Sequence, residues 1–140
     1  MSRIIAGAAG GTTLVSVPGS LTRPTTDRVK EALFSRLDAF EVIADARVLD
    51  LYAGSGSLGV ESASRGAQSV DLVEFDGKAS EVCQRNADLV NTVAGRKVVS
   101  VHRSKVESFL ERTQESVRWD LVFLDPPYPL DEPALAGVLA

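Results

Sequence analysis

The sequence predicts an α/β fold in which a mostly parallel sheet carries helices on both faces, preceded by an N-terminal β-hairpin and helix. Three observations support this prediction. From residue 47 onward, short apolar runs alternate with segments of helical periodicity, as in consecutive strand-helix-strand units. A Gly-x-Gly-x-x-Gly pattern follows the first of these runs, and glycines separate two β-prone runs before residue 20. The 140 residues, 44% of them apolar, suffice for a compact core.

The sequence of the N-terminal segment indicates a hairpin followed by a helix. Residues 3–6 and 12–17 are β-prone, and the glycines between them favour a turn. A helix should begin at Thr26 or Asp27, either of which can cap it. Its apolar face, at helical spacing, would comprise Val29, Ala32, Leu33, Leu37 and Phe40. We therefore expect residues 1–40 to form an extension of a main domain over residues 41–140.

In the main domain, the short apolar runs predict four strands, at residues 47–53, 69–75, 97–102 and 119–125. The intervening helices are expected at residues 58–65, 78–90 and 106–115. Right-handed crossovers would gather the carboxyl ends of the strands at one edge, where ligands bind. Residues 131–140 resemble the opening of another helix with no strand after it. We therefore expect the last strands of the sheet to be missing and the domain to be C-terminally incomplete.

Composition restricts the class of protein. One cysteine allows no intrachain disulfide, no Cys/His spacing suggests a metal, and no apolar run reaches about 18 residues. These features favour a soluble, cytoplasmic protein without a metal or membrane partner. The net charge is −4, yet residues 1–30 carry four basic and one acidic residue, while the remainder carries 11 basic and 18 acidic. A basic N-terminal extension is weak support for contact with phosphates.

The glycine pattern indicates a cofactor that contains adenosine. Gly54, Gly56 and Gly59 follow a predicted strand and open a helix, and Glu74 lies 20 residues beyond Gly54, where it can accept ribose hydroxyls. Asp50 would repel a pyrophosphate but suits the ammonium of S-adenosylmethionine. The alternative is that these residues only turn the chain. The expected cofactor contacts are Asp50, Tyr52, Gly54, Ser55, Gly56, Glu74 and Phe75.

The motif Asp125-Pro126-Pro127-Tyr128 ends the fourth predicted strand and indicates chemistry on an exocyclic amine. Prolines leave their carbonyls free to accept hydrogen bonds. Accepting both amine hydrogens, at the Asp125 carboxylate and the Pro126 carbonyl, would direct the nitrogen lone pair at a methyl sulfonium. Tyr128 would stack on the base, which contributes roughly 1–3 kcal/mol. The alternative is a rigid turn with an ordinary surface tyrosine.

These motifs resemble those of the bacterial 16S rRNA (guanine-N2)-methyltransferases of the small ribosomal subunit, the RsmD family. The resemblance covers nearly the whole chain and is carried by residues 3–7, 23–34, 50–59, 64–67 and 125–128. It implies a Rossmann-like class I S-adenosylmethionine-dependent methyltransferase fold. It also implies methylation of a guanine N2, of the guanine-966 type, in 16S rRNA of an assembling 30S subunit.

The resemblance extends to individual residues. Asp125, Pro126 and Tyr128 would be catalytic, Pro127 and Tyr128 would grip the base, and S-adenosyl-L-methionine would be the cofactor. Arg23 and Thr25 would border the pocket or the RNA. Where relatives contact the adenine after the third strand, this chain offers Lys105 and no carboxylate, so we expect backbone groups to make that contact.

Three other functions remain open from the sequence. The first is an amino-methyltransferase acting on DNA, at adenine N6 or cytosine N4, although no target-recognition segment is visible. The second is a nicotinamide-binding oxidoreductase, which leaves the Asp125 motif unexplained, and the third is a non-catalytic RNA-binding module. We expect a monomer, in which Cys83, His102 and Trp119 pack rather than react.

Overall fold

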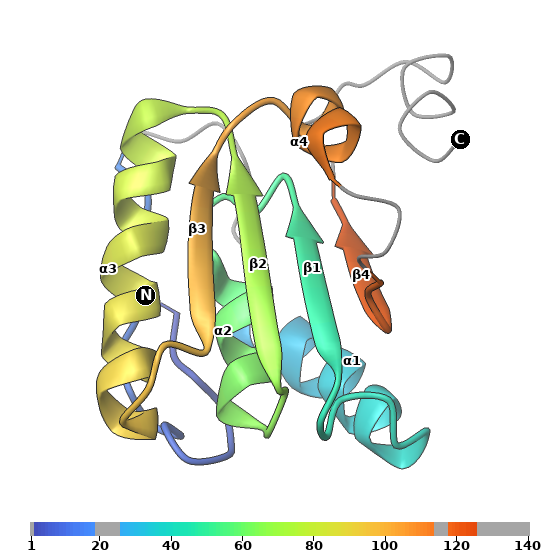
Figure 1. The fold of residues 1–140 in the computed structure, drawn as a ribbon. Helices are drawn as coiled ribbons and strands as arrows, with labels where there is room; N and C mark the ends of the chain where they lie inside the picture. Colours follow the sequence, from blue (N-terminus) through green and yellow to red (C-terminus); the bar gives the residue numbers. More distant parts are fainter. Residues whose placement is uncertain (1, 19–25, 114–117, 126–140) are drawn as a thin grey trace.

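A computed structural model describes residues 2–18, 26–113 and 118–125. Four parallel strands form one sheet in the order β3-β2-β1-β4 (Figure 1). Their bounds are β1 Arg47–Leu51, β2 Ser69–Glu74, β3 Val99–Arg103 and β4 Leu121–Leu124. The predicted parallel sheet is confirmed, and each strand begins or ends within a few residues of its expected position.

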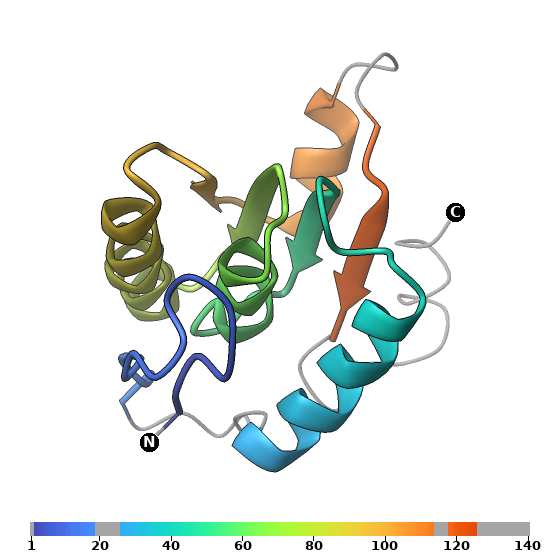
Figure 2. The ribbon, with the colours of Figure 1, turned by 90° about the horizontal axis from the view of Figure 1, so that it is seen from below.

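Helices lie on both faces of the sheet, as predicted. The helices α1 (Asp27–Ala39), α2 (Ser57–Ser64) and α3 (Gly77–Ala94) cover one face, and α4 (Val106–Arg112) covers part of the other (Figure 2). Side chains alternate along each strand, so Val48 and Leu72 point to the larger core, whereas Leu49 and Val73 point to α4. The described part of the chain is therefore a Rossmann-like α/β unit.

The predicted N-terminal hairpin is present in short form, because within the described residues its two runs pair through one antiparallel bridge, between Arg3 and Thr13. Ile4 N–H still donates to the Thr12 carbonyl at 2.9 Å. The next amides, of Ile5 and Ala6, donate instead to the Glu61 carboxylate at 2.8 and 3.1 Å. A buried carboxylate on α2 thus satisfies backbone groups that a longer ladder would otherwise pair.

Helix α1 forms where it was predicted, with Thr26 as its N-cap, and its buried face agrees with the prediction only in part. Leu33 and Leu37 pack partly buried against the core, as expected. Val29 is 58% exposed and Phe40 73% exposed, and Ala32 is exposed as well. Phe34 and Lys30 are the buried residues of this helix. The helix is rotated because Phe34 packs on Phe123 of the sheet, with ring centroids 5.7 Å apart, and because Lys30 finds a buried partner on α2.

Candidate cofactor-binding site

The glycine loop between β1 and α2 lies at the carboxyl edge of the sheet and has an unusual backbone. Tyr52, Gly54 and Gly56 have φ angles of 58°, 61° and 82°. The first is costly for a tyrosine, which indicates that surrounding contacts hold the turn. A Cβ on Gly54 would meet nothing within 4 Å, whereas one on Gly56 would lie 2.8 Å from Leu72. The loop therefore packs against the core on one side and leaves backbone open to a ligand at Gly54.

Gly59 lets α2 lie close to the sheet. A Cβ at this position would lie 2.2 Å from a Leu72 methyl and 3.0 Å from Val70. The third glycine of the pattern thus serves helix packing rather than ligand contact. This close packing fixes the distance of α2, and of the loop that precedes it, from β1 and β2.

Glu74, the last residue of β2, already braces the loop. Its Oε1 accepts from Gly54 N–H at 2.8 Å, and its Oε2 accepts from Asp76 N–H at 3.0 Å. An ionised carboxylate offers about four acceptor sites, so others remain for ribose hydroxyls. Glu74 is thus joined to the glycine loop by a direct hydrogen bond, and its contact with ribose hydroxyls stays a prediction.

Asp50 lies beneath the loop and is 2% exposed. Its Oδ2 accepts from Gly59 N–H at 3.1 Å, at the start of α2. Burial raises the pKa of this carboxyl to about 8, and the negative charges of Asp125 and Glu74 add to that effect, against the lowering by the Gly59 bond. Asp50 is therefore mostly protonated at neutral pH without a ligand, and its pairing with an ammonium group stays a prediction.

Helix α3 supplies two loop contacts that the sequence-based prediction missed. Cys83 donates through Sγ to the Gly54 carbonyl at 2.9 Å, and Asn86 donates through Nδ2 to the Ser55 carbonyl at 2.8 Å. Asn86 is fully buried and also accepts from Val15 N–H at 2.8 Å. One amide therefore joins the N-terminal segment to the glycine loop. The only signal in the sequence was a polar Asn in the apolar stripe of this helix.

The predicted contacts Tyr52 and Phe75 lie at the same edge in different environments. Tyr52 packs partly against the core under α4, and burial raises the pKa of its phenol. Phe75 is 59% exposed, and the ammonium of Lys105 stands 5.4 Å from its ring centroid. A large exposed aromatic ring directly after Glu74 offers a surface for a planar group.

Asp125 follows β4 directly and is exposed at the carboxyl edge. Because Leu124 pairs with Leu51 in parallel register, Asp125 lies level with the start of the glycine loop. Three carboxyl groups, those of Asp50, Glu74 and Asp125, are thus close enough for the latter two to influence the first. The other predicted site residues, Arg23, Thr25, Pro126, Pro127 and Tyr128, lie outside the described residues.

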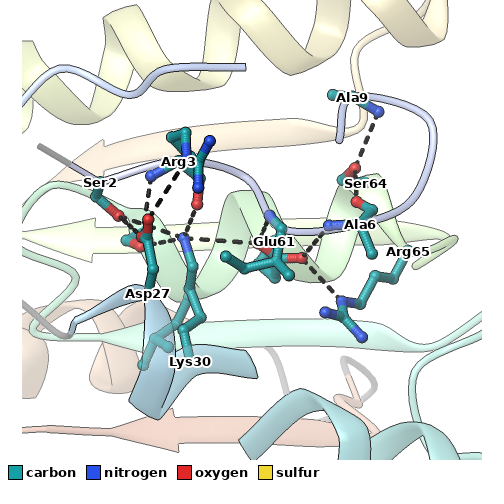
Figure 3. A network of polar contacts seen from close by, with 12 residues as sticks. Ser2, Arg3, Ala6, Ala9, Asp27, Lys30, Glu61, Ser64 and Arg65 are labelled. Atoms are coloured by element: carbon teal, nitrogen blue, oxygen red, sulfur yellow. Dashed lines mark hydrogen bonds and ion pairs between the residues drawn. The ribbon is translucent and has the colours of Figure 1, made fainter. Parts of the chain in front are cut away.

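A buried ion-pair network holds the N-terminal segment against α2 (Figure 3). Lys30 and Glu61 are both 0% exposed, with Nζ and Oε1 3.5 Å apart. Glu61 also accepts from Arg65 Nε at 2.8 Å, and Lys30 donates to the Ser57 hydroxyl at 3.0 Å. Burial lowers the pKa of Lys30, while the nearby Glu61 charge opposes this effect. Since Ser57 directly follows the glycine loop, this network reaches the candidate site.

The residues expected to pack rather than react make contacts with neighbouring side chains or lie in the core. Cys83 is fully buried, and burial raises the pKa of its thiol well above the usual range, as in a core residue. His102 bonds Asp71 at 2.9 Å, and the Trp119 ring lies 6.0 Å from that of Phe109 on α4. Among the described residues, no three His, Cys, Asp or Glu side chains converge as a metal site requires. No helix within the described ranges is long and apolar enough to cross a membrane.

Comparison with known proteins places this geometry in context. The family model described as conserved hypothetical protein 95 matches residues 2–138. Ribosomal RNA small subunit methyltransferase D of Escherichia coli K12 is 41% identical over 126 residues, which are 90% of this chain and 60% of that protein. The protein of the same name from Haemophilus influenzae is 38% identical, over 90% of this chain and 63% of its own length. The chain thus spans less than two thirds of these relatives.

A solved structure supports the likeness in three dimensions. It is that of a hypothetical protein from Thermus thermophilus, with a TM-score of 0.84 and 35% identity. The superposition covers 99% of this chain and 77% of that one. The agreement therefore extends beyond the glycine loop to the arrangement of the whole sheet.

Proposed function

The chain belongs to the family described as conserved hypothetical protein 95, and from this premise we propose that it transfers a methyl group from S-adenosylmethionine to RNA of the small ribosomal subunit. The fold is that of the class I methyltransferases. The names of the two relatives compared above support the substrate. Because this chain is shorter than those relatives, activity has to be tested on this protein itself.

The observation that carries the proposal is the group of three carboxyls around the glycine loop. Glu74 touches the loop backbone, Asp50 lies beneath it, and Asp125 stands at the next strand end. The negative charges of Glu74 and Asp125 would repel a pyrophosphate and attract a sulfonium, and an ammonium placed beside Asp50 would favour the ionised form of that carboxyl. This arrangement supports S-adenosylmethionine over a nicotinamide dinucleotide, which shares the need for a glycine loop and an acidic ribose partner.

The residues present fit this cofactor. Open backbone at Gly54 and the free acceptor sites of Glu74 would hold the ribose, and the exposed Phe75 ring would lie along the adenine. Tyr52 and Ser55 would line the loop side, and Asp50 would take the amino-acid ammonium. When bound, S-adenosylmethionine supplies an electrophilic methyl group, so the task left to the chain is to position and desolvate the acceptor.

For the acceptor we propose the exocyclic N2 amine of a guanine in 16S rRNA, in the position corresponding to guanine 966. Asp125 would accept one amine hydrogen and the Pro126 carbonyl the other, which holds the nitrogen lone pair toward the methyl group. On accepting the methyl group, the amine nitrogen would have to lose one proton, which Asp125 or water would take up. Asp125 is exposed, so the proton has a path to solvent.

The remaining contacts concern the base and its surroundings. Tyr128 would stack on the extruded base and Pro127 would limit its tilt, which offsets part of the cost of unstacking. Arg23 and Thr25 would meet neighbouring RNA, with residues 1–40 acting as an extension of the methyltransferase domain. We further propose that the protein acts in the cytoplasm as a monomer on an assembling 30S subunit.

The test is transfer of labelled methyl groups to 30S subunits from a strain that lacks the corresponding enzyme. We expect transfer by the wild-type protein and none above background with Asp125→Ala. The matched control is Asp88→Ala, which removes an exposed carboxylate from α3 and should leave transfer unchanged. An active Asp125→Ala protein would overturn the mechanism, and duplex DNA as the better acceptor would overturn the substrate.

A further inference from the structure

An open hollow of about 380 Å³ lies at the amino edge of the sheet, opposite the glycine loop. For β1 to β3 this is the lower edge of the sheet in Figure 1. Three separate parts of the chain contribute cations to its lining. These are Arg47 at the start of β1, Arg96 and Lys97 between α3 and β3, and Arg118 just before β4.

The four cations converge without a counter-charge in the described part of the chain. All four side chains belong to exposed residues, and within those ranges no carboxylate lies within 4.0 Å of any of them. Arg96 donates one hydrogen bond, to the Gln68 carbonyl at 3.3 Å, and keeps further donors free. Like charges gathered around one hollow repel each other, so an anion placed there would be stabilised.

Two carboxylates near the hollow, among the residues that the structure describes, are engaged elsewhere. Asp71 bonds His102 Nε2 through one oxygen at 2.9 Å and accepts from the Trp119 indole N–H through the other at 3.1 Å. Asp120 accepts from the Arg47 backbone N–H at 2.9 Å. Both groups therefore organise the wall of the hollow, and neither forms an ion pair with its cations.

We propose that this basic hollow binds phosphates of the RNA substrate away from the methylated base, an inference that rests on the proposed function. Guanidinium groups form bidentate hydrogen bonds with phosphate oxygens. Because the whole chain has a net charge of −4, its attraction to RNA requires a local cluster of cations of this kind. The five residues of β1 span roughly 16 Å from one edge to the other, a length that a few nucleotides cover.

Trp119 makes the proposal testable, because it is the single tryptophan of the chain and lines the hollow. We would titrate the protein with a single-stranded oligoribonucleotide and follow tryptophan emission at several salt concentrations. RNA bound in the hollow should change the emission. The affinity should fall with salt, with a slope that counts the phosphates contacted.

The decisive variant is Arg96→Ala with Lys97→Ala. It should weaken RNA binding about tenfold at low salt and reduce the salt slope by about 1 for each cation removed. The matched control is Arg36→Ala with Arg85→Ala, which removes two exposed cations from α1 and α3 and should leave both quantities unchanged. Binding of S-adenosylmethionine checks folding. If the double variant does not fold, Arg118→Ala alone should reduce the slope by about 1.

The outcomes separate this proposal from the function on which it rests. An unchanged slope in the decisive variant, while the wild-type protein methylates 30S subunits, overturns the hollow and leaves the function standing. A reduced slope in a protein that transfers no methyl group supports the hollow and contradicts the function. Emission changes of equal size with polyglutamate would show an acidic peptide site instead and would overturn the assignment to RNA.

Discussion

At the carboxyl edge of the sheet β1, β2 and β4 end in or near acidic residues, whereas at the amino edge the cations stand at the start of β1 and just before β3 and β4. Asp50, Glu74 and Asp125 gather around the glycine loop at the first edge, and Arg47 and Arg118 belong to the hollow at the second. Two cations, Arg103 at the end of β3 and Lys105 just after it, stand at the side of the acidic edge. The net charge of the chain conceals this separation. One sheet would therefore present the proposed cofactor site and the proposed RNA site at its opposite edges.

Both edges can keep their shape only if the core between them is stable, and the buried ion pair of Lys30 and Glu61 lies in that core. We expect the largest effect on stability when this ion pair is broken. Glu61→Gln leaves Lys30 buried without its counter-charge. It should lower the free energy of unfolding by about 3–5 kcal/mol, the range for a buried ion pair that loses one partner. Urea unfolding measures the change. Glu81→Gln, an exposed carboxylate on α3, serves as control, and a loss no larger than that of the control would show that the network contributes little.

The acidic edge itself is tested by Glu74→Gln. The amide keeps one acceptor but loses the charge and part of the bond to Gly54. We expect S-adenosylmethionine to bind about 10- to 100-fold more weakly, because hydrogen bonds to charged groups contribute roughly 1.5–3 kcal/mol. Calorimetry gives the affinity. An unchanged affinity would mean that this carboxylate only braces the loop.

Asp50, the buried carboxyl of the acidic edge, should make the stability of the protein depend on pH. The pKa of Asp50 is about 8 in the folded protein and near 3.8 in the unfolded chain. Between these values the folded state holds a proton that the unfolded state has lost, so stability falls as pH rises from about 4 to about 8 and then levels. Asp50→Asn should flatten this part of the profile. Parallel profiles for both proteins, measured by urea unfolding from pH 5 to pH 9, would contradict the raised pKa.

The smallest effect is expected from Lys105→Ala, which removes a cation beside Phe75 at the acidic edge. Exposed charges are well screened, so affinity for S-adenosylmethionine should rise by less than about threefold. The sign matters more than the size, because loss of a positive charge should favour a cationic ligand. Lys97→Ala, at the opposite edge, provides the control in the same calorimetric titration and should change nothing. Weaker binding by Lys105→Ala would show that the lysine contacts the cofactor.

Much of the sheet was predictable because its signals are local. Each strand is a short apolar run bounded by turn residues, and the glycine pattern with Glu74 at its fixed distance marks the cofactor edge. The hydrogen bond between Glu74 and Gly54 joins residues 20 apart, yet the order of strand, loop, helix and strand brings them together in any fold of this class.

The rest depended on contacts that no local pattern contains. Helix α1 leaves part of its apolar stripe exposed, at Val29 and Phe40, because its orientation also depends on the pairing of Lys30 with Glu61 on another helix. Asn86 was indistinguishable from a packing residue until α3 was seen to lie over the loop. The basic hollow likewise joins three segments that are far apart in sequence. Periodicity predicts which residues of a helix or strand share an apolar face. Which other elements pack against that face depends on the tertiary structure.

The central claim is that the two edges bind ligands of opposite charge independently. A cross-titration tests it most directly: S-adenosylmethionine and an oligoribonucleotide are each titrated into Glu74→Gln and into the Arg96→Ala, Lys97→Ala double variant. We predict that the first variant loses affinity for the cofactor and retains RNA binding, and that the second does the reverse. Loss of both ligands by either variant, in a protein that remains folded, would contradict the account.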